Sequence, residues 1–81
     1  MKPLLRVRRD TESGYDLRYL YYSENAKVAN TVDVIEGGSV ALDLAADGSV
    51  VGVELLGLEA EERAALERLA LDYGLSLEGF E

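Results

Sequence analysis

The chain of 81 residues contains no cysteine and no histidine. Without cysteine, neither a disulfide framework nor a thiolate metal site can form. Without histidine, the chain lacks the commonest general base and the commonest nitrogen ligand for metals. Only aspartate and glutamate remain as metal ligands, and their spacing matches no metal or acid/base motif. We therefore expect a protein that is not an enzyme and that needs no cofactor.

Long apolar runs are also missing. The N-terminus lacks the apolar stretch of a signal peptide, and no segment approaches the length of a membrane span. We therefore expect a cytoplasmic protein that makes no membrane contact. A chain of this length forms a single domain, residues 1–81, whose core is only marginally sufficient for stability. Oligomerisation is the usual remedy for so small a core.

Positive charge is scarce and unevenly placed. The formal net charge is −8, but residues 1–27 carry six basic and four acidic groups, whereas residues 28–81 carry two and twelve. Such an acidic surface repels nucleic acid and favours a basic protein partner, although solubility alone also accounts for it. We therefore expect no direct contact with nucleic acid. Glutamine is absent and arginine outnumbers lysine six to two, a bias typical either of a thermophile or of genomic base composition.

The clearest structural signal is the stretch from Val40 to Leu56, which reads as two strands joined at Asp47-Gly48. Asp-Gly favours a two-residue type I′ turn, in which both central residues have positive φ. The pairs that this turn sets are Val40 with Leu55, Leu42 with Val53, and Leu44 with Val51. All six side chains are apolar and share one face, as a half-buried antiparallel pair requires.

The rest of the chain predicts an α+β fold. Strands are expected at about residues 4–9, 15–22, 27–35, 39–45 and 49–56, because apolar alternation there is bounded by turn residues. A helix is expected at about residues 59–73, with Gly74 as its C-terminal cap. Since all connections are short, the simplest arrangement is a five-stranded antiparallel meander with the helix packed on one face.

Loop lengths predict how these strands align. A turn at residues 10–14 sets Val7 opposite Leu17, and a loop at residues 23–26 sets Leu17 opposite Val32. One continuous face then holds Leu5, Val7, Leu17, Tyr19, Tyr21, Val28, Val32, Val34, Val40, Leu42, Leu44, Val51, Val53 and Leu55. The predicted helix offers only five apolar residues, which cannot cover so many apolar side chains. An uncovered patch of that size is unusual on a monomer. We therefore expect a homodimer.

Two functional interpretations follow from these faces. The first is a small-ligand-binding domain with a pocket around Tyr19 and Asn30 between sheet and helix, although a buried amide is more often a structural hydrogen-bonding group. The second is a surface for single-stranded nucleic acid, made of tyrosines and arginines. The predicted alignment turns Tyr19 and Tyr21 away from Arg6 and argues against this surface.

The leading interpretation is a non-enzymatic protein-interaction module. The acidic start of the predicted helix and the apolar C-terminal tail are the expected contact surface, which comprises Glu59, Glu61, Glu62, Leu75, Leu77 and Phe80. Carboxylates at a helix N-terminus are stabilised by the helix dipole. The tail residues pack back on the domain or meet a neighbour, and the sequence leaves both open.

Three segments resemble a known family. They are Lys27-Val-Ala-Asn-Thr-Val-Asp-Val34, Val40-Ala-Leu-Asp-Leu44 and Asp47-Gly-Ser-Val-Val-Gly-Val-Glu-Leu-Leu56. Together they resemble domain-of-unknown-function family 2283, a family of small bacterial proteins, over about residues 4–58. The resemblance implies no activity and no catalytic residues. Members are similar to accessory proteins encoded near small toxin-like proteins, which implies an antitoxin-like role that neutralises a basic partner.

Overall fold

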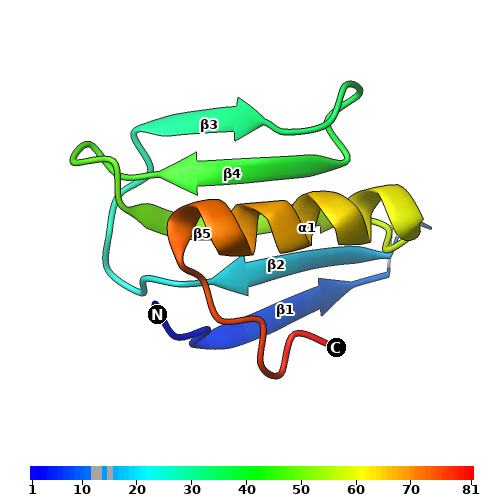
Figure 1. Cartoon of the computed structure of the whole chain (residues 1–81), viewed down its shortest axis with the longest axis horizontal. Coiled ribbons are helices and arrows are strands. Elements are labelled where there is room, and N and C mark those ends of the chain that lie inside the picture. The colour runs from blue at the N-terminus through cyan, green and yellow to red at the C-terminus, as the bar shows by residue number, and fades with distance from the viewer. Residues whose placement is uncertain (12–13, 15) are drawn as a thin grey trace.

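The computed structural model describes residues 1–11, 14 and 16–81. Its elements are β1 (Arg6–Asp10), β2 (Leu17–Tyr21), β3 (Asn30–Asp33), β4 (Val40–Leu44), β5 (Val50–Leu56) and α1 (Ala60–Tyr73). The five strands form one antiparallel sheet, and α1 lies across one of its faces (Figure 1). The predicted α+β class, with five antiparallel strands and a C-terminal helix, is confirmed.

The order of the strands differs from the predicted meander. The sheet runs β1-β2-β5-β4-β3, so β2 pairs with β5 and not with β3. The chain leaves β2 and crosses beyond β5 and β4, and β3 then forms the far edge of the sheet (Figure 1). Residues 22–29 make this connection, and they replace the short loop expected at residues 23–26. Leu17 therefore lies opposite Leu56 rather than Val32.

The central hairpin aligns as predicted along most of its length. Val40 lies opposite Leu55, and Leu42 lies opposite Val53. The turn itself differs, since no residue other than glycine has positive φ among those described, and this excludes a type I′ turn. The side chain of Asp47 accepts the backbone N–H of Ser49 instead (3.0 Å). Within this turn, Gly48 is the one residue with positive φ, at 86°.

A β-bulge explains why the predicted alignment of the two strands is correct although the predicted turn type is wrong. The Gly48 N–H donates to Ala45 O (2.9 Å) and the Ala45 N–H donates to Ser49 O (2.9 Å), so the turn is one residue longer than predicted. The alignment then shifts next to Leu44, which lies opposite Val50 rather than Val51. A bulge places one extra residue on one strand, and here it cancels the extra turn residue.

The alignment of β1 with β2 is also corrected. Val7 lies opposite Leu20, not opposite Leu17. The difference of three positions is odd, and an odd shift moves every side chain of a strand to the other face. Leu20 therefore points toward α1, whereas Tyr19 and Tyr21 belong to the face that α1 leaves open. The predicted turn at residues 10–14 falls partly on residues 12 and 13, and the predicted strand at residues 15–22 begins at residue 15; these three positions lie outside the described residues.

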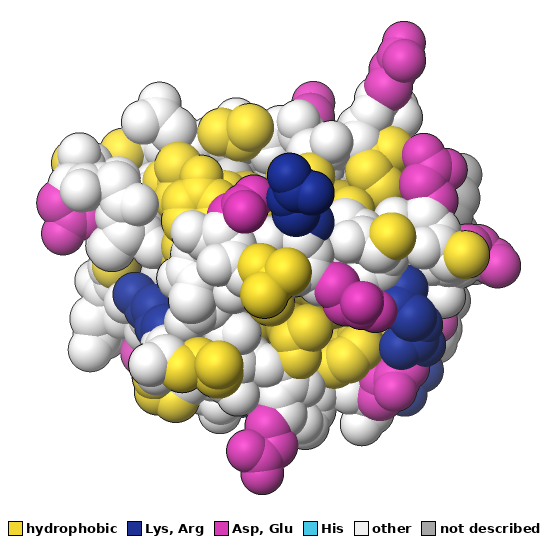
Figure 2. All heavy atoms as spheres, viewed as in Figure 1, with side chains coloured by type: hydrophobic (Ala, Val, Ile, Leu, Met, Phe, Trp, Pro, Cys, Tyr) yellow, Lys and Arg dark blue, Asp and Glu magenta, His cyan; other side chains and the backbone are white. Residues whose placement is uncertain are grey.

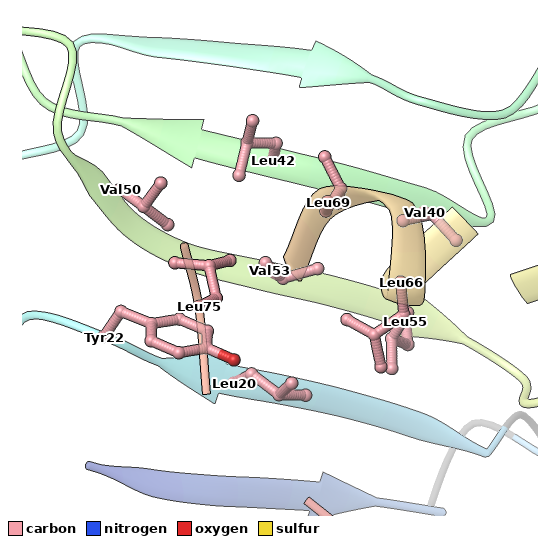
Figure 3. Close-up of a cluster of buried hydrophobic side chains, with 10 residues drawn as sticks. All are labelled: Leu20, Tyr22, Val40, Leu42, Val50, Val53, Leu55, Leu66, Leu69 and Leu75. Carbon is pink, nitrogen blue, oxygen red and sulfur yellow. The ribbon is translucent and has the colours of Figure 1, made fainter. Parts of the chain in front are cut away.

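The core lies between the sheet and α1. Figure 3 shows Leu66 and Leu69 of α1 above the side chains of β4 and β5, with Leu20 and Tyr22 alongside. The core residues are Leu20, Tyr22, Val40, Leu42, Val50, Val53, Leu55, Leu66, Leu69 and Leu75. Burial of this apolar surface is the main driving force for the fold.

The C-terminal tail packs against its own domain. Leu75 is buried in the core, and the backbone of Ser76 accepts the hydroxyl of Tyr22 (2.7 Å). The N-terminal segment pairs with the same stretch, since Lys2 N–H donates to Gly74 O (2.7 Å) and Ser76 N–H donates to Lys2 O (2.9 Å). The tail therefore helps to cover the core that α1 alone was expected to leave open.

Leu20 provides a test of this face assignment. Its side chain is 0% exposed, whereas that of Leu71 on α1 is 82% exposed. We expect Leu20→Ala to lower the free energy of unfolding by about 2–5 kcal/mol, because it leaves a cavity in the core. Leu71→Ala is the matched control and should change it by less than about 0.5 kcal/mol. Similar urea midpoints for the two variants would contradict the assignment.

Candidate interaction surface on the open sheet face

The face of the sheet opposite α1 is crossed by two rows of side chains. The first row contains Arg6, Tyr21, Gly52, Asp43 and Thr31, and the second contains Arg8, Tyr19, Glu54, Ala41 and Asp33. Both rows begin with arginine on β1 and pass through tyrosine on β2. Beyond β2, the charged side chains of both rows are acidic. We call these ten residues the open face.

Tyr19 ties three strands of the open face together. Its ring lies directly over Gly52 of β5, where an added Cβ would come within 2.3 Å of the Tyr19 ring carbon Cε1. The hydroxyl reaches beyond β5 and donates to Oδ2 of Asp43 on β4 (2.5 Å). Only glycine leaves room for this close approach. The ring therefore depends on the absence of a side chain at position 52.

Asp43 collects two hydrogen bonds on this face. Besides the tyrosine hydroxyl, its carboxylate accepts the hydroxyl of Thr31 on β3 (2.6 Å). Burial raises the pKa of the Tyr19 hydroxyl, and the hydrogen bond to the Asp43 carboxylate raises it further. The neutral phenol is thus the form that the fold stabilises. The arrangement keeps the Tyr19 hydroxyl protonated as a hydrogen-bond donor, so that its oxygen is not activated as a base or nucleophile.

Tyr21 continues this chain of contacts toward β1. The rings of Tyr19 and Tyr21 lie 4.7 Å apart at a tilt of 57°. The guanidinium carbon of Arg6 lies 3.6 Å from the centre of the Tyr21 ring, a cation–π contact. Arg6 also pairs with Glu24 (2.9 Å). The basic and aromatic groups are therefore engaged with one another.

This arrangement corrects the predicted separation of tyrosine from arginine. Tyr19 and Tyr21 share a face with Arg6 and Arg8, which is the combination that single-stranded nucleic acids use. However, Arg6 lies over the Tyr21 ring, and the Tyr19 ring lies against Gly52. The formal net charge of −8 also opposes a polyanion. The absence of nucleic-acid binding stays a prediction that now depends on charge and ring contacts.

Acidic groups dominate the charge that is left over for a partner. Among the described residues, ion pairs engage five of the eight basic side chains, which are those of Arg6, Arg9, Arg18, Arg63 and Arg68. The carboxylates in these five pairs are those of Glu24, Asp16, Glu81 and Asp72. Across the described part of the chain, Asp33 and Glu54 of the open face belong to none of these pairs.

The structure divides the predicted helix-and-tail surface into exposed and buried residues. Glu59 and Glu61 are exposed, whereas Glu62 is buried and accepts the backbone N–H of Glu59 (2.9 Å). Leu75 is 2% exposed and belongs to the core. Leu77 and Phe80 are half-buried and pack against the same core. The buried members act within the fold, so the side chains left for a partner are mainly the two exposed glutamates.

The predicted ligand pocket is not assembled from its two residues. Tyr19 belongs to the open face, whereas Asn30 is exposed on β3 and alternates with the open-face residue Thr31. Side chains of successive strand residues point to opposite faces. A hollow with a volume of about 300 Å³ lies elsewhere, beside α1 and the tail. It is lined by Met1, Glu67, Ala70, Leu71, Leu75 and Leu77.

Sequence reasoning missed the role of Gly52. A glycine inside a strand indicates a bulge or a close backbone approach, and this signal was present at position 52. The neighbouring ring could not be identified, because the β2–β5 pairing that brings Tyr19 there joins strands distant in sequence.

Comparison with known proteins identified no relative. No protein-family model, no curated protein and no solved structure matches the chain. Within the described residues, no helix has the length and apolar character that a membrane crossing requires. The resemblance to domain-of-unknown-function family 2283 stays a prediction.

The contact between Tyr19 and Gly52 predicts coupled stability effects. We expect Gly52→Ala to lower the free energy of unfolding by about 1–3 kcal/mol, because the new methyl group displaces the Tyr19 ring. In a Tyr19→Ala background the same substitution should cost markedly less, with a coupling energy of about 0.5–3 kcal/mol. A denaturant double-mutant cycle measures this coupling. Equal costs in both backgrounds would refute the contact.

The raised pKa of Tyr19 predicts a loss of stability in alkali. The unfolded phenol ionises near a pH of about 10, and the folded one does so at higher pH. The stabilisation is therefore fully present below pH ~10 and is lost as the pH rises through the folded pKa. Tyr22, whose burial raises its pKa to about 12, adds a similar loss. In Tyr19→Phe, the decline in unfolding free energy above pH ~10 should be shallower than in the wild type, and an unchanged slope would contradict this.

Proposed function

We propose that this protein is a non-enzymatic interaction module that binds a basic protein partner through its open face. The observation that carries the proposal is the unpaired acidity of the part of that face formed by β3, β4 and β5, next to an uncovered strand edge. Asp33 and Glu54 take part in none of the ion pairs among the described residues, and every residue of β3 is exposed. Opposite charge across such a surface favours encounter and specificity.

The site chemistry supports binding rather than catalysis. The Tyr19 hydroxyl has a raised pKa and donates to Asp43, so it is poorly suited to act as a base near neutral pH. Asp43 is itself held by two donors. These contacts order the surface across three strands and supply no nucleophile. A small-ligand site would need a new location, since Tyr19 and Asn30 occupy different faces.

Oligomeric state is a separate prediction. The homodimer was expected because the helix alone could not cover fourteen apolar side chains. The observed alignment moves Tyr19 and Tyr21 to the open face, and Leu75 enters the core from the tail. The apolar excess is therefore smaller than expected. The homodimer, and the antitoxin-like role implied by the family resemblance, stay predictions.

A matched pair of charge-reversal variants tests the proposal. Asp33→Lys combined with Glu54→Lys changes the open face, whereas Glu67→Lys combined with Glu78→Lys changes net charge equally elsewhere. Each immobilised protein is exposed at low salt to a lysate of the source organism. We expect the wild type and the second variant to retain the same basic protein and the first variant to lose it. Elution should follow rising salt concentration.

Two results would reject the proposed function. One is that no basic protein is retained by the wild type. The other is that the open-face variant retains the same protein as strongly as the control variant does. Circular dichroism and the urea midpoint of each variant establish that the fold is intact before the comparison is made.

A further inference from the structure

We propose that β3 accepts an extended cationic segment of the partner as a sixth strand of the sheet. The segment would carry basic side chains at alternate positions and apolar side chains between them. This inference rests on the proposed function and names the partner chemistry of the same surface. Strand addition to an exposed sheet edge is a recurrent mode of peptide recognition, in which main-chain hydrogen bonds provide affinity.

The backbone of β3 has one unpaired side. The Val34 N–H donates to Val40 O (2.8 Å), and this bond directs the backbone of Val34 toward β4. Alternate residues of an antiparallel strand direct their backbone groups to the same side. The backbone of Val32 therefore also faces β4, while the N–H and C=O groups of Thr31 and Asp33 point away from the sheet. These four groups have the alternating spacing with which an added strand would form main-chain hydrogen bonds.

The side chains of β3 define what the incoming strand should carry. On the open face, Asp33 would lie beside alternate residues of the added strand, with Asp43 and Glu54 behind it in the sheet. Basic residues at those positions would be attracted. On the other face, Val32 is 46% exposed and Val28, just before β3, is 45% exposed. Apolar side chains are visible over β3 and β4 in Figure 2.

The two edges of the sheet are not equally available. The edge strand β1 carries three arginines, and the only proline of the chain, Pro3, precedes it. Charged side chains and proline are devices that protect sheet edges from added strands. The edge strand β3 has a single charged residue, Asp33, and is exposed along its whole length. The structure therefore favours β3 as the receiving edge.

Charge favours a cationic partner over a second copy of this chain. A symmetric pairing centred on Val32 would place Asp33 of one copy opposite Thr31 of the other. It would also bring two acidic open faces together, each on a chain of net charge −8. Like charges that approach each other across strands are destabilising. A segment with basic and apolar residues in alternation satisfies the same backbone groups without this repulsion.

A designed peptide tests the inference on the unmodified protein. The probe is the acetylated and amidated heptapeptide Lys-Val-Lys-Val-Lys-Val-Lys. The first control carries N-methyl groups on the residues that would donate to β3, which removes the donors and keeps the charge. The second control has glutamate in place of lysine. Affinity is measured by titration, and the contact site by backbone amide NMR at low salt.

We expect the probe to perturb the Thr31 and Asp33 amides most and to slow their hydrogen exchange. The N-methylated control should bind roughly tenfold more weakly, a loss of about 1.4 kcal/mol, because it cannot donate hydrogen bonds to the C=O groups of Thr31 and Asp33. The glutamate control should not bind. Equal affinity of probe and N-methylated control, or shifts centred on α1, would overturn strand addition and leave the proposed function standing. So would the absence of any binding.

Measurements on the protein without peptide show whether a second copy of the chain occupies the edge of β3. If light scattering shows a dimer of the protein alone, and its Thr31 and Asp33 amides are already slow to exchange, the edge belongs to another copy and the inference is wrong. Failure of the proposed function is recognised differently, in the lysate comparison: either the wild type retains no basic protein, or the open-face variant retains it as strongly as the control variant does.

Discussion

The pairing of β2 with β5 is the constraint on which the rest of the structure depends. It gives β5 a hydrogen-bonded neighbour on each side, β2 and β4, and makes it the central strand. Since β2 already pairs with β1 and β5, the segment that follows β2 cannot pair with it, and this segment joins the sheet at the far edge, beside β4. The exposed strand β3 and the long connection at residues 22–29 are both consequences of this one pairing.

The same pairing builds the open face. It brings Tyr19 beside β5, where Gly52 leaves space for the ring, and this allows the hydroxyl to reach Asp43 on the next strand. The contact of Arg6 with Tyr21 extends the row to the opposite edge. One face of the sheet is therefore ordered by polar and aromatic contacts, while the other is ordered by apolar burial under α1. Under the proposed function, the open face serves recognition and the face under α1 serves stability.

Local features of the fold could be predicted from the sequence, because local interactions set them. The strands, the helix, the cap at Gly74 and most of the central hairpin follow from alternation and turn residues. The strand order could not be predicted, because turn residues do not specify pairing between strands distant in sequence. The face on which Tyr19 lies was predicted wrongly because the predicted alignment of β1 with β2 was shifted by an odd number of residues.

The candidate site could likewise be predicted only in part from the sequence. The acidity of the surface could be predicted from composition, but its location could not. Glu62 and Leu75 were expected to meet a partner, and the fold uses them to cap α1 and to fill the core. Asp33 and Glu54 belong to no motif in the sequence, and they become candidate contact residues only because β3 lies at an edge of the sheet. The site is thus a property of the strand order more than of any motif.

Amide hydrogen exchange of the free protein, measured residue by residue by NMR, tests the strand order most directly. If β5 is central and β3 is an edge, the β5 amides should be among the slowest to exchange. In β3, Val32, whose backbone faces β4, should exchange more slowly than Thr31 and Asp33, whose backbone groups face solvent. A meander would give the reverse result, with β3 protected on both sides and alternate β5 amides exchanging fast. That pattern would contradict the pairing of β2 with β5 and, with it, the proposed surface.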